Sequence, residues 1–366
     1  MLNAKNNSLQ FLLGLALTCM LVLHYYREAS QARQIESAER ALARLQSDIG
    51  DEQLVGSSEQ KPEQLLSELR TSHNWKPSGQ KSSPAASDQG RDLILYSYHE
   101  TEGAAKNFVF FMTHALHAKA DFIIIINGDH TQDLGAVSAL PNVRIVEREN
   151  RCFDLGGYNE VFQTDATLIT RYKRFMFIND SLRGPFFPAW ADKICWSDAY
   201  WDKLDERTRL VGMSWNCANG IPYPPHLQSM ILAFTRETLQ ELLLPHMKCF
   251  EDMHSAVADG ETAIAQRVMA AGYDVYAMES RFAAHAGDMR KNTTSFLEWC
   301  VDTPDTVGRG GDDILHTGNY LGSTLHPYET IFAKTNRDWD ERDRKVIDIL
   351  TEHADLMHYS SYDTCI

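Results

Sequence analysis

The sequence predicts an α/β domain with a mostly parallel β-sheet and flanking helices, preceded by a transmembrane helix and a stem. Short apolar runs at 92–96, 121–127, 143–146 and 175–178 have the length and composition of buried strands. Segments with helical apolar spacing alternate with these runs, beginning with residues 104–117. Strands that alternate with helices at this spacing favour parallel pairing through right-handed crossovers.

Composition supports a globular protein that does not bind nucleic acid. A 43% hydrophobic content is enough for a sizeable core in one large domain. The net charge of −15 opposes a nucleic-acid binder, which normally carries a basic face. A phosphate-bearing ligand would therefore have to be met by local positive groups or by a divalent cation.

The amino terminus predicts a membrane anchor. Residues 9–26 form an 18-residue span that is apolar up to Leu23 apart from Gln10 and Thr18, near the lower limit for crossing a bilayer. We expect residues 1–8 to be a cytoplasmic tail and residues 9–26 a signal anchor, giving a single-pass type II protein. A signal peptide cleaved near Ala32 is the alternative. Either way, the bulk of the protein would face the secretory lumen or the exterior.

Residues 27–90 read as a stem, and residues 91–366 as the folded domain. Within the stem, apolar residues recur at spacings of 3, 4, 3 and 4, which is the seam of a short coiled coil: Ile35, Ala38, Leu42, Leu45 and Ile49. This seam allows a homodimer, although a single solvated helix fits the same pattern. Residues 50–90 are rich in Ser, Gln, Pro, Lys and Glu, as linkers are.

Six cysteines follow the predicted anchor, and in an oxidising compartment they favour disulfides. Six cysteines allow 15 pairings, among which the sequence does not choose. They are Cys152, Cys195, Cys217, Cys249, Cys300 and Cys365. The sequon at Asn292 is a candidate glycan site for a lumenal protein.

Two strands end in polar turns that suggest a ligand site. The run at 175–178 leads directly to Asn179-Asp180-Ser181, and the run at 143–146 leads to Asp154 beside Gly156 and Gly157. In open α/β sheets, ligands bind just beyond the carboxyl ends of the strands. Glycines at the start of a helix let a phosphate or sugar approach the backbone closely. The two junctions together suggest a nucleotide-type site.

These motifs, in this order, resemble the rhamnan synthesis protein F family of glycosyltransferases. The matching segments are Asn127-Gly128, 149–158, 177–185 and 226–229, and the resemblance covers roughly residues 92–337. It implies a GT-A (Rossmann-like) fold and a nucleotide-sugar donor. It also implies a hexosyl- or deoxyhexosyl-transferase acting on a glycan or glycoprotein acceptor, usually with Mn²⁺ or Mg²⁺. With the anchor, it implies a Golgi or other secretory membrane.

The resemblance implies roles for individual residues. Asp180 would bind the cation, although many GT-A enzymes have Asp-x-Asp where this chain has Asn179-Asp180-Ser181. His326 is the candidate second metal ligand, and Lys334 and Arg337 could neutralise the leaving diphosphate. The remaining donor- or acceptor-binding candidates are Asn127, Asn150, Asp154, Gly156, Gly157, Asn179, Ser181 and Gln228.

Glu261 and Asp259 are the candidate catalytic bases, because GT-A enzymes commonly place such a carboxylate before a late helix. A helix N-terminus lowers the pKa of a carboxyl and favours the ionised form. We expect Glu261 to be the better base, and the alternative for Asp259 is an ordinary helix N-cap.

Two other functions are compatible with a secreted α/β domain. A sulfotransferase needs a phosphate-cradling loop after the first strand, and residues 97–106 do not contain one. A non-catalytic carbohydrate-binding protein would keep the fold but lose turnover, and the single carboxylate at Asp180 is compatible with it. Release of nucleotide from a nucleotide sugar separates an enzyme from such a binding protein.

Overall fold

The computed structural model describes residues 90–191, 193–218, 223–282, 293–302 and 313–365. The predicted tail, the anchor, the stem up to residue 89 and the sequon at Asn292 lie outside these residues. Within the described part of the chain, no helix is both long enough and apolar enough to cross a bilayer.

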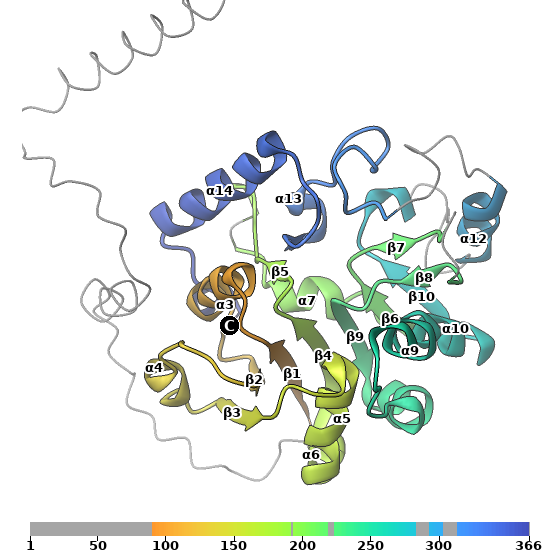
Figure 1. Cartoon of the computed structure of the whole chain (residues 1–366), viewed down its shortest axis with the longest axis horizontal. Coiled ribbons are helices and arrows are strands. Elements are labelled where there is room, and N and C mark those ends of the chain that lie inside the picture. Colours follow the sequence, from red (N-terminus) through yellow and green to blue (C-terminus); the bar gives the residue numbers. More distant parts are fainter. Residues whose placement is uncertain (1–89, 192, 219–222, 283–292, 303–312, 366) are drawn as a thin grey trace, which may run out of the picture. The chain divides into compact units, whose positions relative to one another are not determined.

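A seven-stranded sheet forms the centre of the domain (Figure 1), in the order β10-β6-β9-β4-β1-β2-β3. Strands β3, β2, β1 and β4 pair in parallel, as do β6 and β10, whereas β9 runs antiparallel to both β4 and β6. The prediction of a mostly parallel sheet with flanking helices is confirmed, but the reversed direction of β9 was not predicted. The strands are β1 Arg91–Tyr98, β2 Ala120–Asn127, β3 Val143–Arg148, β4 Tyr172–Asn179, β6 Thr208–Gly212, β9 Ile231–Thr235 and β10 Asp274–Ala277.

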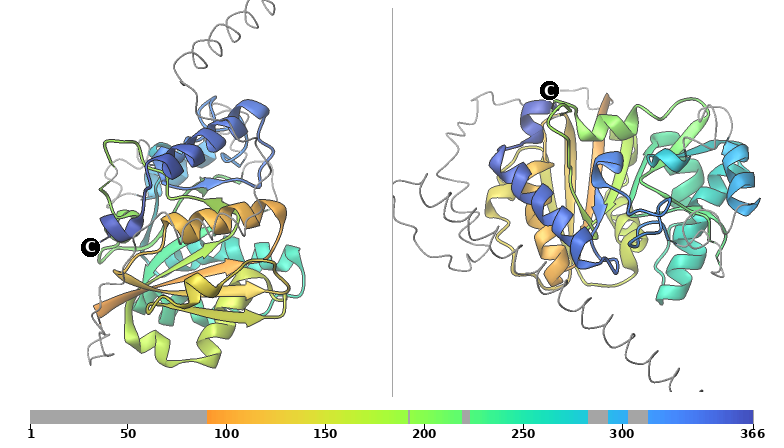
Figure 2. Two further views of the ribbon diagram at one scale, coloured as in Figure 1. Left: turned by 90° about the vertical axis from the view of Figure 1, so that its left-hand side faces the viewer. Right: turned by 90° about the horizontal axis from the view of Figure 1, so that it is seen from above.

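Helices cover both faces of the sheet (Figure 2). Successive side chains of β1 point to opposite faces, so Leu93 and Leu95 enter one core while Ile94 and Tyr96 enter the other. The first core is completed by α5 (Phe153–Thr164) and α10 (Thr262–Ala270). The second is completed by α3 (Glu102–His114) and α7 (Trp196–Trp201). Burial on both faces explains why the strand sequences are continuously apolar.

Shorter elements complete the domain. Two small antiparallel sheets pair β5 (Leu182–Arg183) with β11 (Ala333–Lys334) and β7 (Trp215–Asn216) with β8 (His226–Leu227). The long helix α14 (Glu341–Leu356) packs through Ile347 and Leu350 against Phe110 of α3 in a third, smaller core. The other α-helices are α4 Gly135–Ser138, α6 Thr167–Arg171, α8 Arg236–Thr238, α9 Met253–Ser255, α12 Thr293–Asp302, α13 Pro327–Thr330 and α15 Ser361–Thr364.

All six cysteines of the domain form disulfides. The pairs are Cys152–Cys249, Cys195–Cys365 and Cys217–Cys300. Each pair joins segments more than 80 residues apart, with separations of 97, 170 and 83 residues. Crosslinks that close loops of this length restrict the unfolded chain strongly.

Candidate functional site

The candidate site lies at the carboxyl edge of the parallel strands. Because β1, β2, β3 and β4 are parallel, the residues that follow them meet at one edge. Antiparallel β9 begins at this same edge, where the N–H of Asn179 donates to the carbonyl of Met230 (3.0 Å). Residues that are far apart in the sequence are thereby brought together.

Asp180 is held in the turn after β4 by its backbone and by one side-chain bond. Its N–H donates to the carbonyl of Ser97 (3.0 Å), and its own carbonyl accepts from Nδ2 of Asn107 (2.7 Å). The backbone N–H of His99 donates to Oδ2 of the carboxylate (2.6 Å). Burial raises the pKa of this carboxyl to about 7, and the charge of Asp154 acts in the same direction. A cation bound near Asp180 would lower this pKa again, because a positive charge stabilises the ionised carboxylate.

Asp154 lies next to Asp180 and is fixed by two strands. Ser97 Oγ of β1 donates to Oδ1 (2.9 Å), and Asn179 Nδ2 of β4 donates to Oδ2 (2.8 Å). The predicted proximity of the two polar turns is thus observed. Asn179 also accepts from the hydroxyl of Ser181 (2.5 Å), so it orders the turn while it holds Asp154.

The backbone before Asp154 is strained. Cys152 and Phe153 have φ angles of 69° and 55°, in the left-handed region that non-glycine residues rarely adopt. Conformations of this kind cost on the order of 1–3 kcal/mol each and cluster at functional sites. The disulfide from Cys152 to Cys249 ties this segment to a distant part of the chain.

Packing requires a glycine at position 156 of α5 but not at position 157. A Cβ on Gly156 would lie 2.4 Å from the Cβ of Cys152, so the disulfide segment fills that space. A Cβ on Gly157 would make ordinary contacts, 3.5 Å from Nη1 of Arg148 and 3.6 Å from Oδ1 of Asn127. Both glycines are buried.

Asn127 and Asn150 belong to a polar cluster around His99. Asn127 is buried; its Nδ2 donates to Ser97 Oγ (3.0 Å) and its Oδ1 accepts from Arg148 Nη1 (2.5 Å). The buried Asn127 therefore holds Ser97 and Arg148 in place at the carboxyl edge of the sheet. His99 Nδ1 lies 2.9 Å from the carbonyl of Asn127, and its Nε2 lies 3.3 Å from Nδ2 of Asn150. Asn150 is exposed and remains accessible to a ligand.

Glu261, but not Asp259, enters a pocket with Asp154. This small pocket is lined by Asp154, Glu261 and Ser229, together with Phe153, Leu155, Tyr158, Phe250 and Ala256. Glu261 ends a π-helical turn (Ala256–Glu261) just before α10. Asp259 is exposed, 3.8 Å from Nζ of Lys248.

The environment of Glu261 corrects the expectation of a lowered pKa. Burial raises the pKa of this carboxyl, although a hydrogen bond with Ser229 and the charge of Lys334 oppose the rise. Because desolvation outweighs the helix N-terminus, Glu261 takes up a proton more readily than an exposed glutamate does.

A basic pair lies across from these carboxylates. Lys334 belongs to β11, which pairs with β5 directly after the Asp180 turn. The pKa of its amine is lowered to about 8, mainly by burial and also by the charge of Arg337, against the opposing charges of Asp313, Glu261 and Asp154. Arg337 Nε donates to Oδ2 of Asp313 (2.7 Å).

Gln228 is turned toward the protein. It is buried; its Oε1 accepts from Ser214 Oγ (2.7 Å) and its Nε2 donates to Oδ1 of Asp313 (3.1 Å). The structure therefore places this predicted binding residue in support of Asp313.

His326 caps a helix. Its Nδ1 accepts from the N–H of Tyr328 (3.2 Å) at the start of α13, and the ring is exposed. Among the described residues, the one group of three potential metal ligands is His117, Cys195 and Cys365. Its two cysteines form a disulfide, so they are not available as thiolate ligands.

Several residues at the site were not predicted from the sequence. Ser97, His99, Asn107 and Arg148 position the predicted residues, and Asp313 holds Arg337 and Gln228. The position of His99 directly after the first strand was a usable signal. No sequence pattern marked Asp313 as a site residue, because it lies in an irregular segment far along the chain.

No family model matches this chain, and no curated protein matches it. Among solved structures, the chain is similar to mannosyltransferase PcManGT from Pyrobaculum calidifontis in complex with GDP-Man and Mn²⁺. The two share 14% sequence identity over 58% of this chain and 61% of that chain, at a TM-score of 0.33. Glycosyltransferase GlyE of Streptococcus pneumoniae TIGR4 shares 11% identity over 74% of this chain and 65% of that one, at a TM-score of 0.35. A glycosyltransferase involved in the glycosylation of the major capsid of PBCV-1 shares 12% sequence identity. That match covers 41% of this chain and 62% of that one, at a TM-score of 0.26. Each of these three matches spans less than two thirds of the known protein, and similarity at this level does not assign a function.

Proposed function

We propose that this chain is a glycosyltransferase that moves a hexosyl or deoxyhexosyl group from a nucleotide-sugar donor to a hydroxyl of a glycan or glycoprotein. One observation carries the proposal: at the carboxyl edge of the sheet, Asp154 lies near Asp180, Glu261 and Lys334. The motif resemblance to the rhamnan synthesis protein F family supports the same reaction. The proposed location is the lumenal side of a secretory membrane.

The charge balance of the site favours a divalent cation. The carboxyls of Asp313, Glu261 and Asp154 are near enough to act on the charge of Lys334, and one edge of the Arg337 guanidinium pairs with Asp313. A divalent cation would offset the carboxylate charge that opposes binding of a diphosphate. Asp180 fits this role because its Oδ2 accepts one hydrogen bond and its Oδ1 accepts none from the described residues. Carboxylate oxygens suit Mg²⁺ and Mn²⁺. A bound ion would neutralise charge that develops on the leaving diphosphate.

Three other residues of the site would have separate roles in the reaction. Glu261 is placed to accept the proton of the acceptor hydroxyl, and Asp154 to receive hydrogen bonds from the donor. Lys334, with a pKa of about 8, is mostly protonated at neutral pH and can pair with the leaving phosphate.

A donor screen tests the proposal. The full chain is incubated with UDP-, GDP- and TDP-sugars, with Mn²⁺ and a glycan mixture, and nucleotide release is measured. We expect release from one nucleotide class. Binding of a nucleotide sugar without release from any donor would contradict the enzyme and favour a carbohydrate-binding protein.

A further inference from the structure

We propose that Asp313 is a positioning residue that directs the guanidinium of Arg337 toward the diphosphate of the donor. The proposal rests on the proposed function for the identity of the ligand. It adds a residue, about 130 positions beyond Asp180, to the residues that recognise the donor. It also explains why an acidic side chain lies beside a basic pair meant for an anion.

The carboxylate of Asp313 is the centre of a hydrogen-bond network. Oδ2 accepts from Arg337 Nε (2.7 Å), while Oδ1 accepts from Gln228 Nε2 (3.1 Å) and from the backbone N–H of Leu315 (3.1 Å). His316 Nε2 lies 3.9 Å from Oδ2. Both oxygens are thus used within the protein, so Asp313 is not a free acid facing a ligand.

The contact with Asp313 occupies only one edge of the Arg337 guanidinium. The bond is made through Nε, and neither Nη group donates to a described residue. The two Nη groups therefore keep the donor pair that binds phosphate oxygens in parallel. A free arginine side chain has many rotamers, and the Asp313 contact removes much of this freedom before a ligand arrives.

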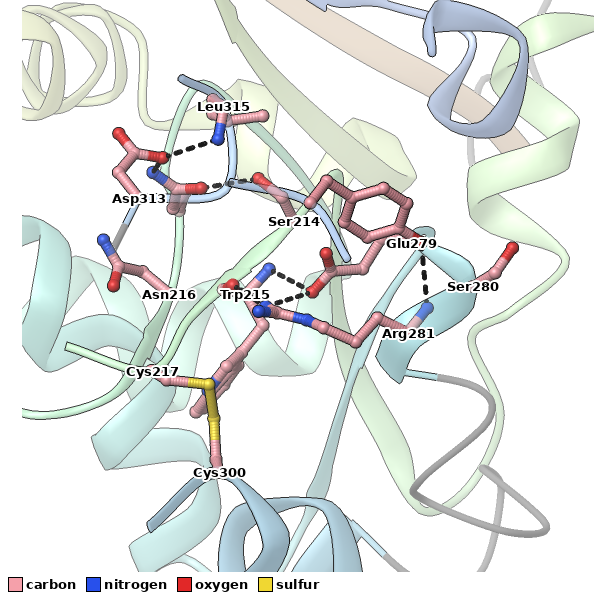
Figure 3. A network of polar contacts seen from close by, with 12 residues as sticks. Ser214, Trp215, Asn216, Cys217, Glu279, Ser280, Arg281, Cys300, Asp313 and Leu315 are labelled. Carbon is pink, nitrogen blue, oxygen red and sulfur yellow. Dashed lines mark hydrogen bonds and ion pairs between the residues drawn. A yellow bond between two sulfur atoms is a disulfide. The ribbon is translucent and has the colours of Figure 1, made fainter. Parts of the chain in front are cut away.

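The base of this network is rigid. Ser214 Oγ donates to Oε1 of Gln228 (2.7 Å), and Ser214 precedes Trp215 of β7. Figure 3 shows how a buried ion pair holds the backbone of Trp215 on both sides. Glu279 Oε1 accepts from the N–H of Trp215 (3.1 Å), and Arg281 Nη2 donates to its carbonyl (2.7 Å). Preorganised supporting contacts of this kind fix a binding group in its productive geometry.

A simple countercharge would behave differently from a positioning residue. If Asp313 only offset the charge of Arg337, then removing its negative charge would strengthen anion binding. If Asp313 orients Arg337, then its removal weakens binding, provided that Arg337 is present. The sign of the effect, and its dependence on Arg337, separate the two roles.

The test is a double-mutant cycle with Asp313→Asn and Arg337→Gln in the full chain. Affinity for inorganic pyrophosphate with Mg²⁺ is measured by calorimetry. We expect Asp313→Asn to weaken binding roughly tenfold or more, as loss of a charge-assisted hydrogen bond does. In the Arg337→Gln background it should not weaken binding further. Asp92→Asn is the matched control, since Asp92 pairs with Arg174 (2.9 and 2.8 Å) at the start of β1.

Three results would overturn the proposal. They are tighter binding by Asp313→Asn, an equal loss with and without Arg337, and no pyrophosphate binding by the wild type at millimolar concentration. Because pyrophosphate carries no sugar, the cycle does not depend on turnover. A chain that passes this test but releases no nucleotide in the donor screen would keep the positioning role and lose the transferase function.

Discussion

The buried Glu279–Arg281 pair should make the protein less stable as the pH rises. Glu279 is fully buried, and burial raises the pKa of its carboxyl from 4.5 to about 7, even though Arg281 lies 3.0 Å away and opposes the rise. The unfolded chain therefore loses this proton before the folded chain does. The stabilising contribution is complete below pH 4.5 and is lost as the pH rises to about 7. One pKa unit corresponds to about 1.4 kcal/mol, so the total is about 3 kcal/mol.

Replacing Glu279 by glutamine isolates this effect. Glutamine keeps an acceptor for the N–H of Trp215 but cannot titrate. Urea denaturation at pH 5 and pH 8, without reductant, gives the free energy of unfolding for both proteins. Relative to Glu279→Gln, the wild type should lose about 2 to 3 kcal/mol between these values, since all other titrating groups are shared.

Glu160→Gln is the matched control, because Arg148 holds the pKa of that carboxyl below its usual range. Relative to Glu160→Gln, the wild type should show no such loss above pH 5, because both proteins keep Glu279 and the lowered pKa of Glu160 leaves it ionised throughout. A wild type that keeps or gains stability relative to Glu279→Gln would mean that attraction to Arg281 outweighs desolvation, and would refute the reasoning.

Two further predictions concern the site. Gly156→Ala should lower the free energy of unfolding by roughly 1–3 kcal/mol in urea denaturation, because its Cβ would overlap Cys152. Gly157→Ala should leave it unchanged or raise it by up to about 1 kcal/mol, because alanine has the higher helix propensity and its Cβ makes ordinary contacts; equal effects would contradict the packing account. In a pH–rate profile, turnover should fall as the pH drops through the pKa of Glu261, at a higher pH than for an exposed glutamate, since burial raises that pKa. Glu261→Gln should cost roughly 10²–10⁴ in rate and remove this acidic limb; an unchanged profile would exclude Glu261 as the base.

The sequence was most informative where a short apolar run ended in a polar turn. Asp154 and Asp180 each follow such a run, and parallel pairing brings them together as predicted. Local pattern is sufficient there, because the carboxyl ends of parallel strands share one edge.

Features that depend on distant pairing were not predictable in the same way. The antiparallel direction of β9 brings Ser229 to the Asp154 edge, yet its apolar sequence is equally compatible with either direction. The glycines of α5 looked like a ligand-binding turn, and only the partner of Cys152 reveals that Gly156 packs against a disulfide segment. Likewise, a helix N-terminus is visible in sequence, whereas the burial that raises the pKa of Glu261 is not.

The central claim is that Asp180 binds a divalent cation for the donor diphosphate, and metal-dependent turnover of matched variants tests it most directly. The account predicts that EDTA abolishes nucleotide release by the wild type and that Mn²⁺ restores it. Asp180→Asn should release nucleotide on the order of a hundredfold more slowly, with or without Mn²⁺, while Asp92→Asn should keep the metal response. A wild type that is indifferent to EDTA while Asp180→Asn is inactive would contradict the cation site and leave Lys334 and Arg337 to carry the diphosphate.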